Sequence, residues 1–214
     1  MNGNNWDKTK ASTFHRRSIR IGEYDYSQAG AYFVTICAKN RQCLFGSIKE
    51  GNMAPNQFGE VATACWTQLP CRFSEVETDA YAVMPNHIHG IVVIKRDVGA
   101  IHELPTSAGA AVRRRGMLLP QIIGWFKMNS AKRINQILGK QGTPVWQRNY
   151  WEHVVRDEQS LIRIREYVLS NPSRWHFDRN NPERTGEDEF DRWLTSPIRP
   201  VRTSRPVKTT EPPH

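Results

Sequence analysis

Two histidines lie one residue apart in the stretch Ala82 to Ile94, which reads AVMPNHIHGIVVI. The apolar, β-branched run after them is typical of a buried strand. Alternate side chains of a strand point to opposite faces, so we expect His87 and His89 on one face and Ile88 on the other. Two adjacent imidazoles could bind a metal ion, although a His-x-His pair alone is more often structural. The pair is therefore a candidate metal site that needs support from elsewhere in the chain.

A second group of polar side chains falls on a predicted helix that begins at the N-cap candidate Asp157 and stops at Asn171, before a proline. Three apolar residues form its packed stripe: Leu161, Ile164 and Val168. Arg163, Tyr167 and Asn171 are spaced by four on an adjoining face. Tyr167 is expected at the edge of the buried stripe with its hydroxyl able to reach an open site, although such a tyrosine usually anchors packing.

The elements that must position these residues follow from hydrophobic periodicity. In order, the pattern predicts a strand over 31–38, a loop or hairpin over 39–53, a helix over 55–69, strands over 76–84 and 87–95, a helix over 119–138, a strand over 143–155 and a helix over 157–171. This order predicts an α+β fold: a ferredoxin-like, four-stranded antiparallel sheet with helices on one face and an additional C-terminal helix carrying the tyrosine.

The 214 residues, 38% of them hydrophobic, are enough for one compact domain with tails. We expect a basic flexible arm over 1–29, a single folded domain over 30–178 and a basic, Pro-rich, disordered tail over 179–214. Residues 96–116 lack periodicity and are predicted to form a flexible loop. The spacings of the four cysteines match neither a zinc site nor a small disulfide scaffold, which indicates reduced thiols.

Lys and Arg outnumber Asp and Glu by 30 to 21, which gives a formal charge of +9 and favours a polyanionic partner. The residues expected to contact DNA phosphates are Arg16, Arg17, Arg20, Arg113, Arg114, Arg115, Lys127, Lys132 and Arg163. No apolar run is long enough to span a bilayer, and none follows the basic N-terminal residues as a secretion signal would. We therefore expect a cytoplasmic protein that binds nucleic acid and no membrane.

Three segments, GAYFVTICAKNRQCLFG, VMPNHIHGIVVI and VWQRNYWEHVVRDEQSLIRIREYVLSNPSRW, resemble the REP-associated tyrosine transposases of the HUH superfamily. The resemblance covers about residues 30–175 in the expected order. It implies that His87 and His89 are the metal-binding His-hydrophobic-His pair and that Tyr167 is the nucleophile. In related single-tyrosine transposases a glutamine four residues after the nucleophile completes the metal site. Asn171 holds that place here and becomes the expected third ligand.

The resemblance further implies a metal-dependent, single-stranded DNA endonuclease and strand transferase, with Mg²⁺ or Mn²⁺ as cofactor and a 5′-phosphotyrosine intermediate. The expected partner is single-stranded or hairpin DNA, such as REP-like repeats, and the protein is expected to be a monomer, with a dimer possible. The residue types agree with this chemistry. A tyrosine hydroxyl, with an ordinary pKa of about 10, is a poor nucleophile at neutral pH unless it is assisted.

Two other functions fit parts of the sequence. A non-catalytic nucleic-acid-binding module could share the predicted fold, but it should carry the aromatic RNA-binding signature on a sheet strand. Neither AYFVTICA nor HGIVVIK supplies that signature. A zinc hydrolase could use the histidine pair, but no general-base carboxylate lies near it in sequence. The tyrosine endonuclease is therefore the preferred interpretation.

Overall fold

A computed structural model describes residues 25–95 and 117–195 of the chain. Its main sheet has four strands, β1 (Gly30–Cys37), β4 (Val76–Met84), β5 (His87–Ile94) and β6 (Trp151–Val155). The strand order is β4-β5-β1-β6, and every neighbouring pair is antiparallel. The predicted four-stranded antiparallel sheet is confirmed, and β5 with its two histidines is one of the two central strands.

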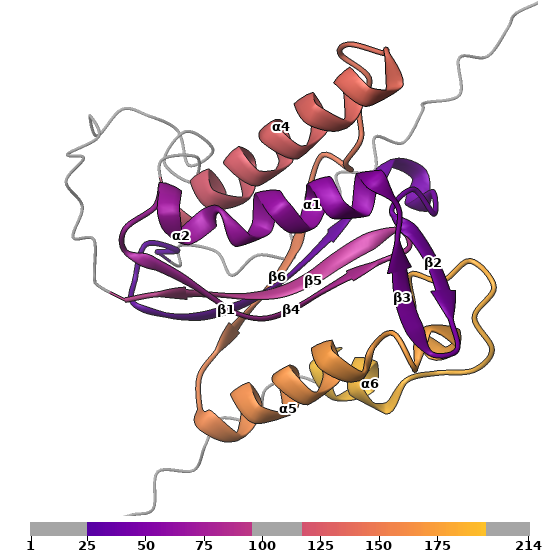
Figure 1. The fold of residues 1–214 in the computed structure, drawn as a ribbon. Coiled ribbons are helices and arrows are strands. Elements are labelled where there is room, and N and C mark those ends of the chain that lie inside the picture. The colour runs from indigo at the N-terminus through magenta and orange to yellow at the C-terminus, as the bar shows by residue number, and fades with distance from the viewer. Residues whose placement is uncertain (1–24, 96–116, 196–214) are drawn as a thin grey trace, which may run out of the picture.

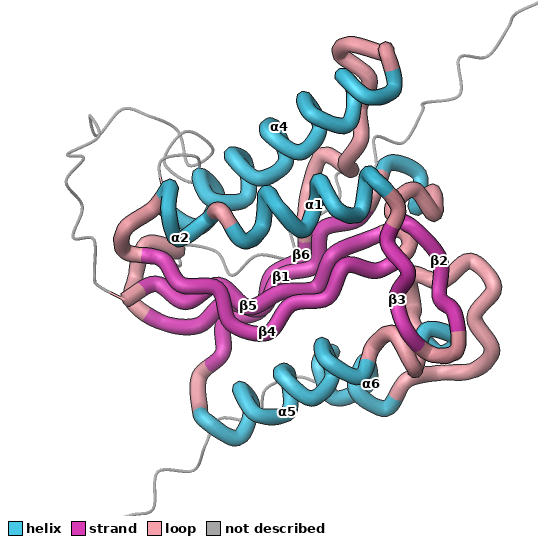
Figure 2. The backbone as a smooth tube through the Cα atoms, in the orientation of Figure 1, coloured by secondary structure: helices cyan, strands magenta, loops and turns pink. Residues whose placement is uncertain are grey.

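Helices cover both faces of this sheet, so the domain has three layers (Figures 1 and 2). One face carries α1 (Gln57–Thr67), α2 (Leu69–Arg72) and α4 (Leu118–Leu138). The opposite face carries α5 (Glu158–Ser170) and α6 (Glu189–Thr195). Two short 3-10 helices, η1 (Lys39–Arg41) and η2 (Trp175–Phe177), lie in the connections. The predicted additional helix with the tyrosine, α5, is thus separated by the sheet from α1 and α4.

Of the two alternatives predicted over 39–53, a loop or a hairpin, the segment after η1 forms a hairpin, with strands β2 (Gly46–Lys49) and β3 (Asn52–Pro55). Both residues of its two-residue turn, Glu50 and Gly51, have positive φ angles of 49° and 76°. Such a turn matches the twist of the strands that it joins. The hairpin stands beside one end of the main sheet (Figure 1).

The ends of the long helices follow from their capping residues. The Asp157 carboxylate accepts a hydrogen bond from the Ser160 backbone N–H at 2.8 Å, which confirms the predicted N-cap of α5. The Asn56 side chain caps α1 in the same way. Gly139 ends α4 with φ of 63°, a left-handed conformation that costs glycine little. These local signals explain why the helices lie close to their predicted ranges.

The predicted strand over 143–155 is wrong in its first half, because β6 begins only at Trp151. Trp146 makes an isolated bridge to Ala38, and the chain then leaves the sheet. The carbonyl oxygens of Gln147 and Arg148 accept hydrogen bonds from Lys127 Nζ on α4, at 2.5 and 2.9 Å. Carbonyls directed at α4 cannot extend the ladder to β1.

The predicted disordered tail, 179–214, also begins too early, because residues 179–195 are folded and include α6. Phe190 and Leu194 of α6 are buried against the sheet face that α5 covers. A helix of seven residues gives little periodicity to detect, and its stability comes from this packing. The predicted arm, the predicted loop over 96–116 and the rest of the tail lie outside the described residues.

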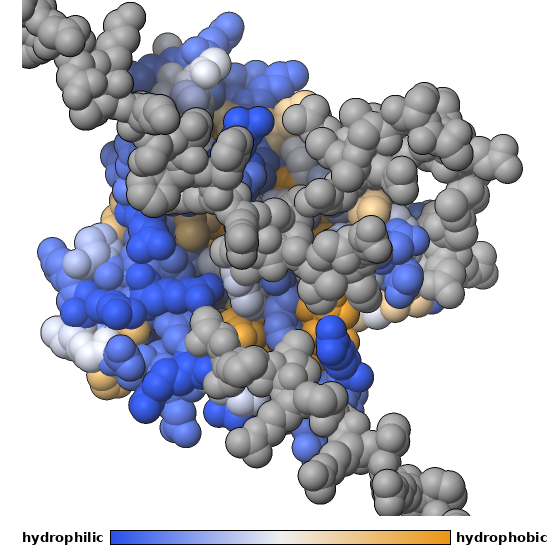
Figure 3. Space-filling model, turned by 180° about the vertical axis from the view of Figure 1, so that it is seen from behind, coloured by the Kyte–Doolittle hydropathy of each residue, from blue (hydrophilic) through white to orange (hydrophobic). Residues whose placement is uncertain are grey.

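No helix among the described residues is long and apolar enough to cross a membrane. Seen from behind, the described surface is mainly hydrophilic, with apolar residues in small patches (Figure 3). All four cysteines, Cys37, Cys43, Cys65 and Cys71, are free thiols, as predicted.

Candidate metal site and tyrosine

The histidine pair lies at the start of β5, where alternation places both side chains on the face that α5 and α6 cover. His87 and His89 are 0% and 1% exposed, and their ring centroids are 4.3 Å apart. Ile88 points to the opposite face and joins the core beneath α1 and α4. The predicted shared face of the two histidines is therefore observed.

A carboxylate that the sequence analysis did not identify completes a cluster with them. Asp178 directly follows η2, and its Oδ2 lies 3.5 Å from Nε2 of both His87 and His89. The three potential ligand atoms lie within 4.8 Å of one another. Asp178 sits in an irregular segment, so neither periodicity nor a motif marks it. Only the path of the chain after α5 brings it to the histidines.

The charges of this cluster suit metal binding. Burial, reinforced by the nearby His89, lowers the pKa of His87 to about 3, so its imidazole is neutral near pH 7. Burial alone would raise the pKa of Asp178, but the neighbouring His87 and His89 and the Asn180 backbone N–H outweigh burial and hold that pKa well below its usual range. A neutral imidazole and an ionised carboxylate are the forms in which these side chains bind metal ions.

Tyr167 lies next to the cluster, with its hydroxyl 3.3 Å from His89 Nε2. Its ring is stacked on Phe190 of α6, with centroids 3.8 Å apart, and meets Phe33 of β1 edge-on at 6.1 Å. Tyr167 is only 4% exposed, so it is more buried than its predicted place at the edge of the stripe. The cause is α6, which fell in the predicted tail. Burial, followed by the negative charge of Asp178, raises the pKa of the phenol well above its usual range.

Asn171 is buried one turn beyond Tyr167 and touches the carboxylate of the cluster. Its Nδ2 donates a hydrogen bond to Asp178 Oδ2 at 3.0 Å. Its Oδ1 is buried and has no hydrogen-bond partner among the described residues. The structure thus brings Asn171 to the site, and its role as a metal ligand stays a prediction.

Two buried atoms test whether a cation fits this place. His87 Nε2 and Asn171 Oδ1 both lack a hydrogen-bond partner among the described residues, and buried polar atoms without partners are costly. Asn171 Oδ1 offers a lone pair, and His87 Nε2 lies beside the Asp178 carboxylate. The group formed by His87, His89 and Asp178 could therefore hold a metal ion.

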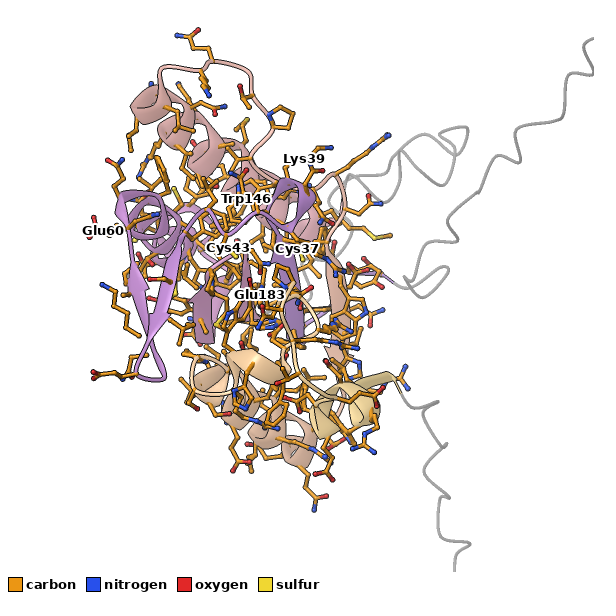
Figure 4. All side chains as sticks on the ribbon, turned by 90° about the vertical axis from the view of Figure 1, so that its right-hand side faces the viewer. Cys37, Lys39, Cys43, Glu60, Trp146 and Glu183 are labelled. Carbon is orange, nitrogen blue, oxygen red and sulfur yellow. The ribbon has the colours of Figure 1, made fainter. Side chains whose placement is uncertain are left out.

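The loop that brings Asp178 to the site crosses the end of the sheet at which β1 finishes. Figure 4 looks onto this end, where Cys37 and the loop that carries Glu183 lie close together. Asn180 Oδ1 accepts a hydrogen bond from Cys37 Sγ at 3.6 Å. The loop is thus attached to β1 directly beside the histidine strand.

The predicted DNA-contacting residues are spread over the molecule. Lys132 is exposed on α4, while Lys127 on the same helix donates to the backbone carbonyls described above. The Arg163 guanidinium lies 4.7 Å from the Trp193 ring centroid. Arg163 and Tyr167 both line a pocket of about 640 Å³ between α5 and α6. The remaining six arginines, in 16–20 and 113–115, lie outside the described residues.

No family model matches the chain. An uncharacterised Haemophilus influenzae protein is 39% identical over 177 residues, which cover 80% of this chain and 96% of the relative. A second H. influenzae protein, provisionally named a REP-associated tyrosine transposase, is 26% identical over 157 residues, which cover 69% of this chain and 73% of the relative.

Two solved structures are also similar. One is a REP-associated tyrosine transposase bound to a REP hairpin, with 17% identity, a TM-score of 0.43 and coverage of 73% of each chain. The other, from Deinococcus radiodurans R1, is provisionally described as a transposase; it has 16% identity and a TM-score of 0.41, and covers 66% of this chain and 89% of its own.

The fold and the site together define an α+β protein with a buried His-x-His and carboxylate cluster beside a tyrosine. The chain is a distant homologue of the H. influenzae protein that is named as a REP-associated tyrosine transposase.

Proposed function

We propose that this protein is a metal-dependent, single-stranded DNA endonuclease and strand transferase that acts through Tyr167 and uses hairpin repeat DNA. One observation carries the proposal. The Tyr167 hydroxyl, predicted to be the nucleophile, lies 3.3 Å from an imidazole of the only His, Cys, Asp and Glu cluster among the described residues that could hold a metal ion. Two segments 78 residues apart in sequence thus meet beside one candidate metal site, which supports a shared role.

The ring contacts of Tyr167 prepare it for this role. Phe33 and Phe190 hold the phenol from two directions, so few ring orientations are open to it. The hydroxyl thereby stays near His89, and attack from a fixed position avoids much of the entropy cost of a bimolecular step. Because the pKa of the phenol is raised, Tyr167 is protonated near neutral pH and needs nearby positive charge to react.

We propose that His87, His89, Asp178 and Asn171 hold the cation. A bound Mg²⁺ or Mn²⁺ would polarise a phosphate oxygen and offset the charge that forms on the phenolate. Hard divalent cations prefer oxygen ligands, and the carboxylate of Asp178 and the Asn171 amide supply them beside the two imidazole nitrogens. Asp178 thus adds an oxygen ligand that the sequence analysis lacked.

In the proposed reaction, the Tyr167 oxygen bonds to the scissile phosphorus, and the bond from phosphorus to the 3′ oxygen breaks. The phenolic proton leaves Tyr167, and the departing 3′ oxygen gains a proton. The products are a 5′-phosphotyrosine ester and a free 3′-hydroxyl. The phosphodiester energy is retained in the new ester, so a 3′-hydroxyl can attack it in the reverse reaction and rejoin DNA without ATP.

Similarity to a relative and the charge of the chain support the proposed substrate class. The 26% identical relative is named for its association with REP sequences, and the present chain has a formal charge of +9. Contacts of cationic side chains with phosphates supply much of the affinity of such proteins for DNA. We propose single-stranded or hairpin DNA as the partner, with the predicted basic residues along its backbone.

The experiment is to incubate the protein with Mn²⁺ and a labelled single-stranded hairpin taken from its own genomic flanks. A denaturing gel should show a covalent protein-DNA adduct. No adduct should form in a parallel reaction that contains a chelator in place of Mn²⁺. A duplex of the same sequence serves as the control and should give much less adduct. Binding without any adduct would favour the non-catalytic nucleic-acid-binding module instead.

A further inference from the structure

Asn86 directly precedes His87 in the turn between β4 and β5, and it is 0% exposed. Its Nδ2 donates two hydrogen bonds to backbone carbonyls, to Arg41 O at 3.0 Å and to Asn180 O at 2.8 Å. Its Oδ1 lies 2.8 Å from His87 Nδ1. The amide therefore uses both of its ends, and each bond reaches a different segment near the site.

These contacts determine which nitrogen of His87 carries the proton. A backbone carbonyl oxygen can only accept a hydrogen bond, so the NH₂ end of Asn86 must face Arg41 O and Asn180 O. The oxygen end is then left for His87, and it can only accept. Nδ1 of His87 must donate, which leaves Nε2 of the neutral ring with its lone pair. Nε2 is the nitrogen that faces the Asp178 carboxylate.

The same amide also holds the loop that delivers Asp178. Asn180, whose carbonyl Asn86 binds, donates its own backbone N–H to Asp178 Oδ1 at 2.6 Å. On the other side, Asn40 and Arg41 have φ angles of 56° and 54°, a conformation that is unfavourable for side-chain-bearing residues and persists only where contacts impose it. Asn86 is one such contact, since it binds the Arg41 carbonyl.

His89 provides the contrast. Its Nδ1 lies 2.9 Å from the Thr35 hydroxyl, which can either donate or accept. Thr35 therefore permits both neutral forms of His89, whereas Asn86 permits one form of His87.

We propose that Asn86 is a positioning residue: it fixes His87 as the Nδ1-protonated form, with Nε2 presented to the metal site, and it secures the loop of Asp178. This inference rests on the proposed metal site. Outer hydrogen-bond partners of metal-binding histidines commonly orient the ring in this way, and their removal costs about 10- to 100-fold in metal affinity.

Two measurements test the inference on the full-length protein. The first records ¹⁵N NMR spectra of the imidazoles in chelator-treated protein, with His87→Gln used to assign the His87 signals. The second is a Mn²⁺ titration without DNA. Both are made on wild type, Asn86→Ala, which removes the acceptor, and Asn86→Asp, which keeps the acceptor and removes both donors. Thr35→Val is the matched control, because it removes an equally buried contact to the other histidine.

We expect the wild-type His87 signals to show a protonated Nδ1 and an unprotonated Nε2. In Asn86→Ala the Nε2-protonated form should appear, and Mn²⁺ affinity should fall about 10- to 100-fold. Asn86→Asp should keep the Nδ1 proton, and Thr35→Val should leave the His87 signals unchanged.

A wild-type His87 protonated at Nε2 would overturn the inference whether or not the variants fold. An unchanged His87 spectrum and Mn²⁺ midpoint in Asn86→Ala would overturn it too. If the wild type binds no Mn²⁺, the proposed metal site fails, while the spectra of the metal-free protein still decide whether Asn86 fixes His87.

Discussion

The two faces of the central sheet are built from the same strands but differ in chemistry. Beneath α1 and α4, β5 contributes Ile88, Val92 and Ile94 to a large apolar core. On the face beneath α5 and α6, the alternate positions of β5 carry the buried His87 and His89 and then Ile91, which belongs to a smaller apolar cluster. One strand thus stabilises the fold with one face and presents reactive groups with the other.

Buried polar atoms without a hydrogen-bond partner among the described residues occur on both faces, and Trp66 Nε1 and Asn135 Oδ1 are those on the α1 and α4 side. On the α4 side, the buried Ser130 hydroxyl donates to the Phe126 carbonyl and accepts from Trp146 Nε1, so its bonding is complete. At the site, His87 Nε2 and Asn171 Oδ1 have no hydrogen-bond partner among the described residues. An apolar core can support such a site because its burial energy offsets the cost of these atoms.

Removal of the Tyr167 hydroxyl, on the side of the sheet that α5 and α6 cover, should have the largest effect. Tyr167→Phe should form no covalent DNA adduct, since the attacking oxygen is gone, while the ring still packs against Phe33 and Phe190. Denaturing gels measure the adduct, and hairpin binding and thermal unfolding serve as controls that should stay close to wild type. Continued labelling would show that another residue is the nucleophile.

The polar face should also make the stability of metal-free protein depend on pH. Unfolded His87 takes up a proton near its ordinary pKa of about 6.5, whereas the folded residue does so near 3. Between these values the unfolded state binds more protons, so each unit of acidification should lower the free energy of unfolding by about 1.4 kcal/mol. The lowered pKa of Asp178 has a separate window, because its stabilising contribution is lost only below the unfolded value of about 3.9.

Urea denaturation in chelator between pH 6 and pH 4.5 measures this slope. His87→Gln removes the titrating group and should flatten the curve relative to wild type by about the amount given above. Parallel curves for the two proteins would show that His87 is not buried as a neutral ring.

The apolar core on the opposite face of the sheet can be disrupted at Gly90, the residue that follows His89. A Cβ at Gly90 would lie 2.2 Å from the Trp66 ring, so Gly90→Ala forces the core beneath α1 to shift. Overpacking of this kind costs about 1–3 kcal/mol of stability. Because the clash is on the opposite face, Mn²⁺ affinity of the folded protein should be retained. A large loss of affinity without a loss of stability would show that the two faces are not independent.

Asn171→Ala tests the oxygen side of the site. If Asn171 binds the metal, cleavage should need about tenfold more Mn²⁺. Loss of its buried hydrogen bond to Asp178 should lower the thermal stability of the metal-free protein in either case, so the Mn²⁺ midpoint is the deciding measurement. A lower stability of the metal-free protein with an unchanged Mn²⁺ midpoint would mean that Asn171 only ends α5 before Pro172.

The smallest effect concerns DNA contacts outside the site. Binding of the DNA hairpin should weaken steeply as the salt concentration rises. Arg163→Gln, in the pocket beside Tyr167, should reduce the slope of this salt dependence by about one. Lys132→Gln tests the predicted contact on α4, on the other side of the sheet, and should also reduce the slope. Lys49→Gln removes an exposed lysine outside the predicted contacts and is the control that should leave the slope unchanged, whereas a flat salt dependence of the wild type would exclude phosphate contacts altogether.

The sequence by itself determined the features that depend on regular spacing. Alternation along β5 placed His87 and His89 on one face, and the four-residue interval placed Tyr167 and Asn171 on one side of α5. The cap at Asp157 and the glycine at 139 fixed helix ends, because capping is a local interaction. These short-range rules were enough to predict the four-stranded sheet and the strand and helix, β5 and α5, that carry the predicted site residues.

Only the tertiary structure decided how that site is completed and covered. Asp178 and Phe190 lie beyond α5 in irregular chain and a short helix, where no periodic pattern reports which way a side chain points. Likewise, the segment just before the late start of β6 is held by Lys127, 20 residues from the Gln147 carbonyl that it binds. Such contacts are chosen by the packing of distant segments, so they can be recognised only once the chain has brought those segments together.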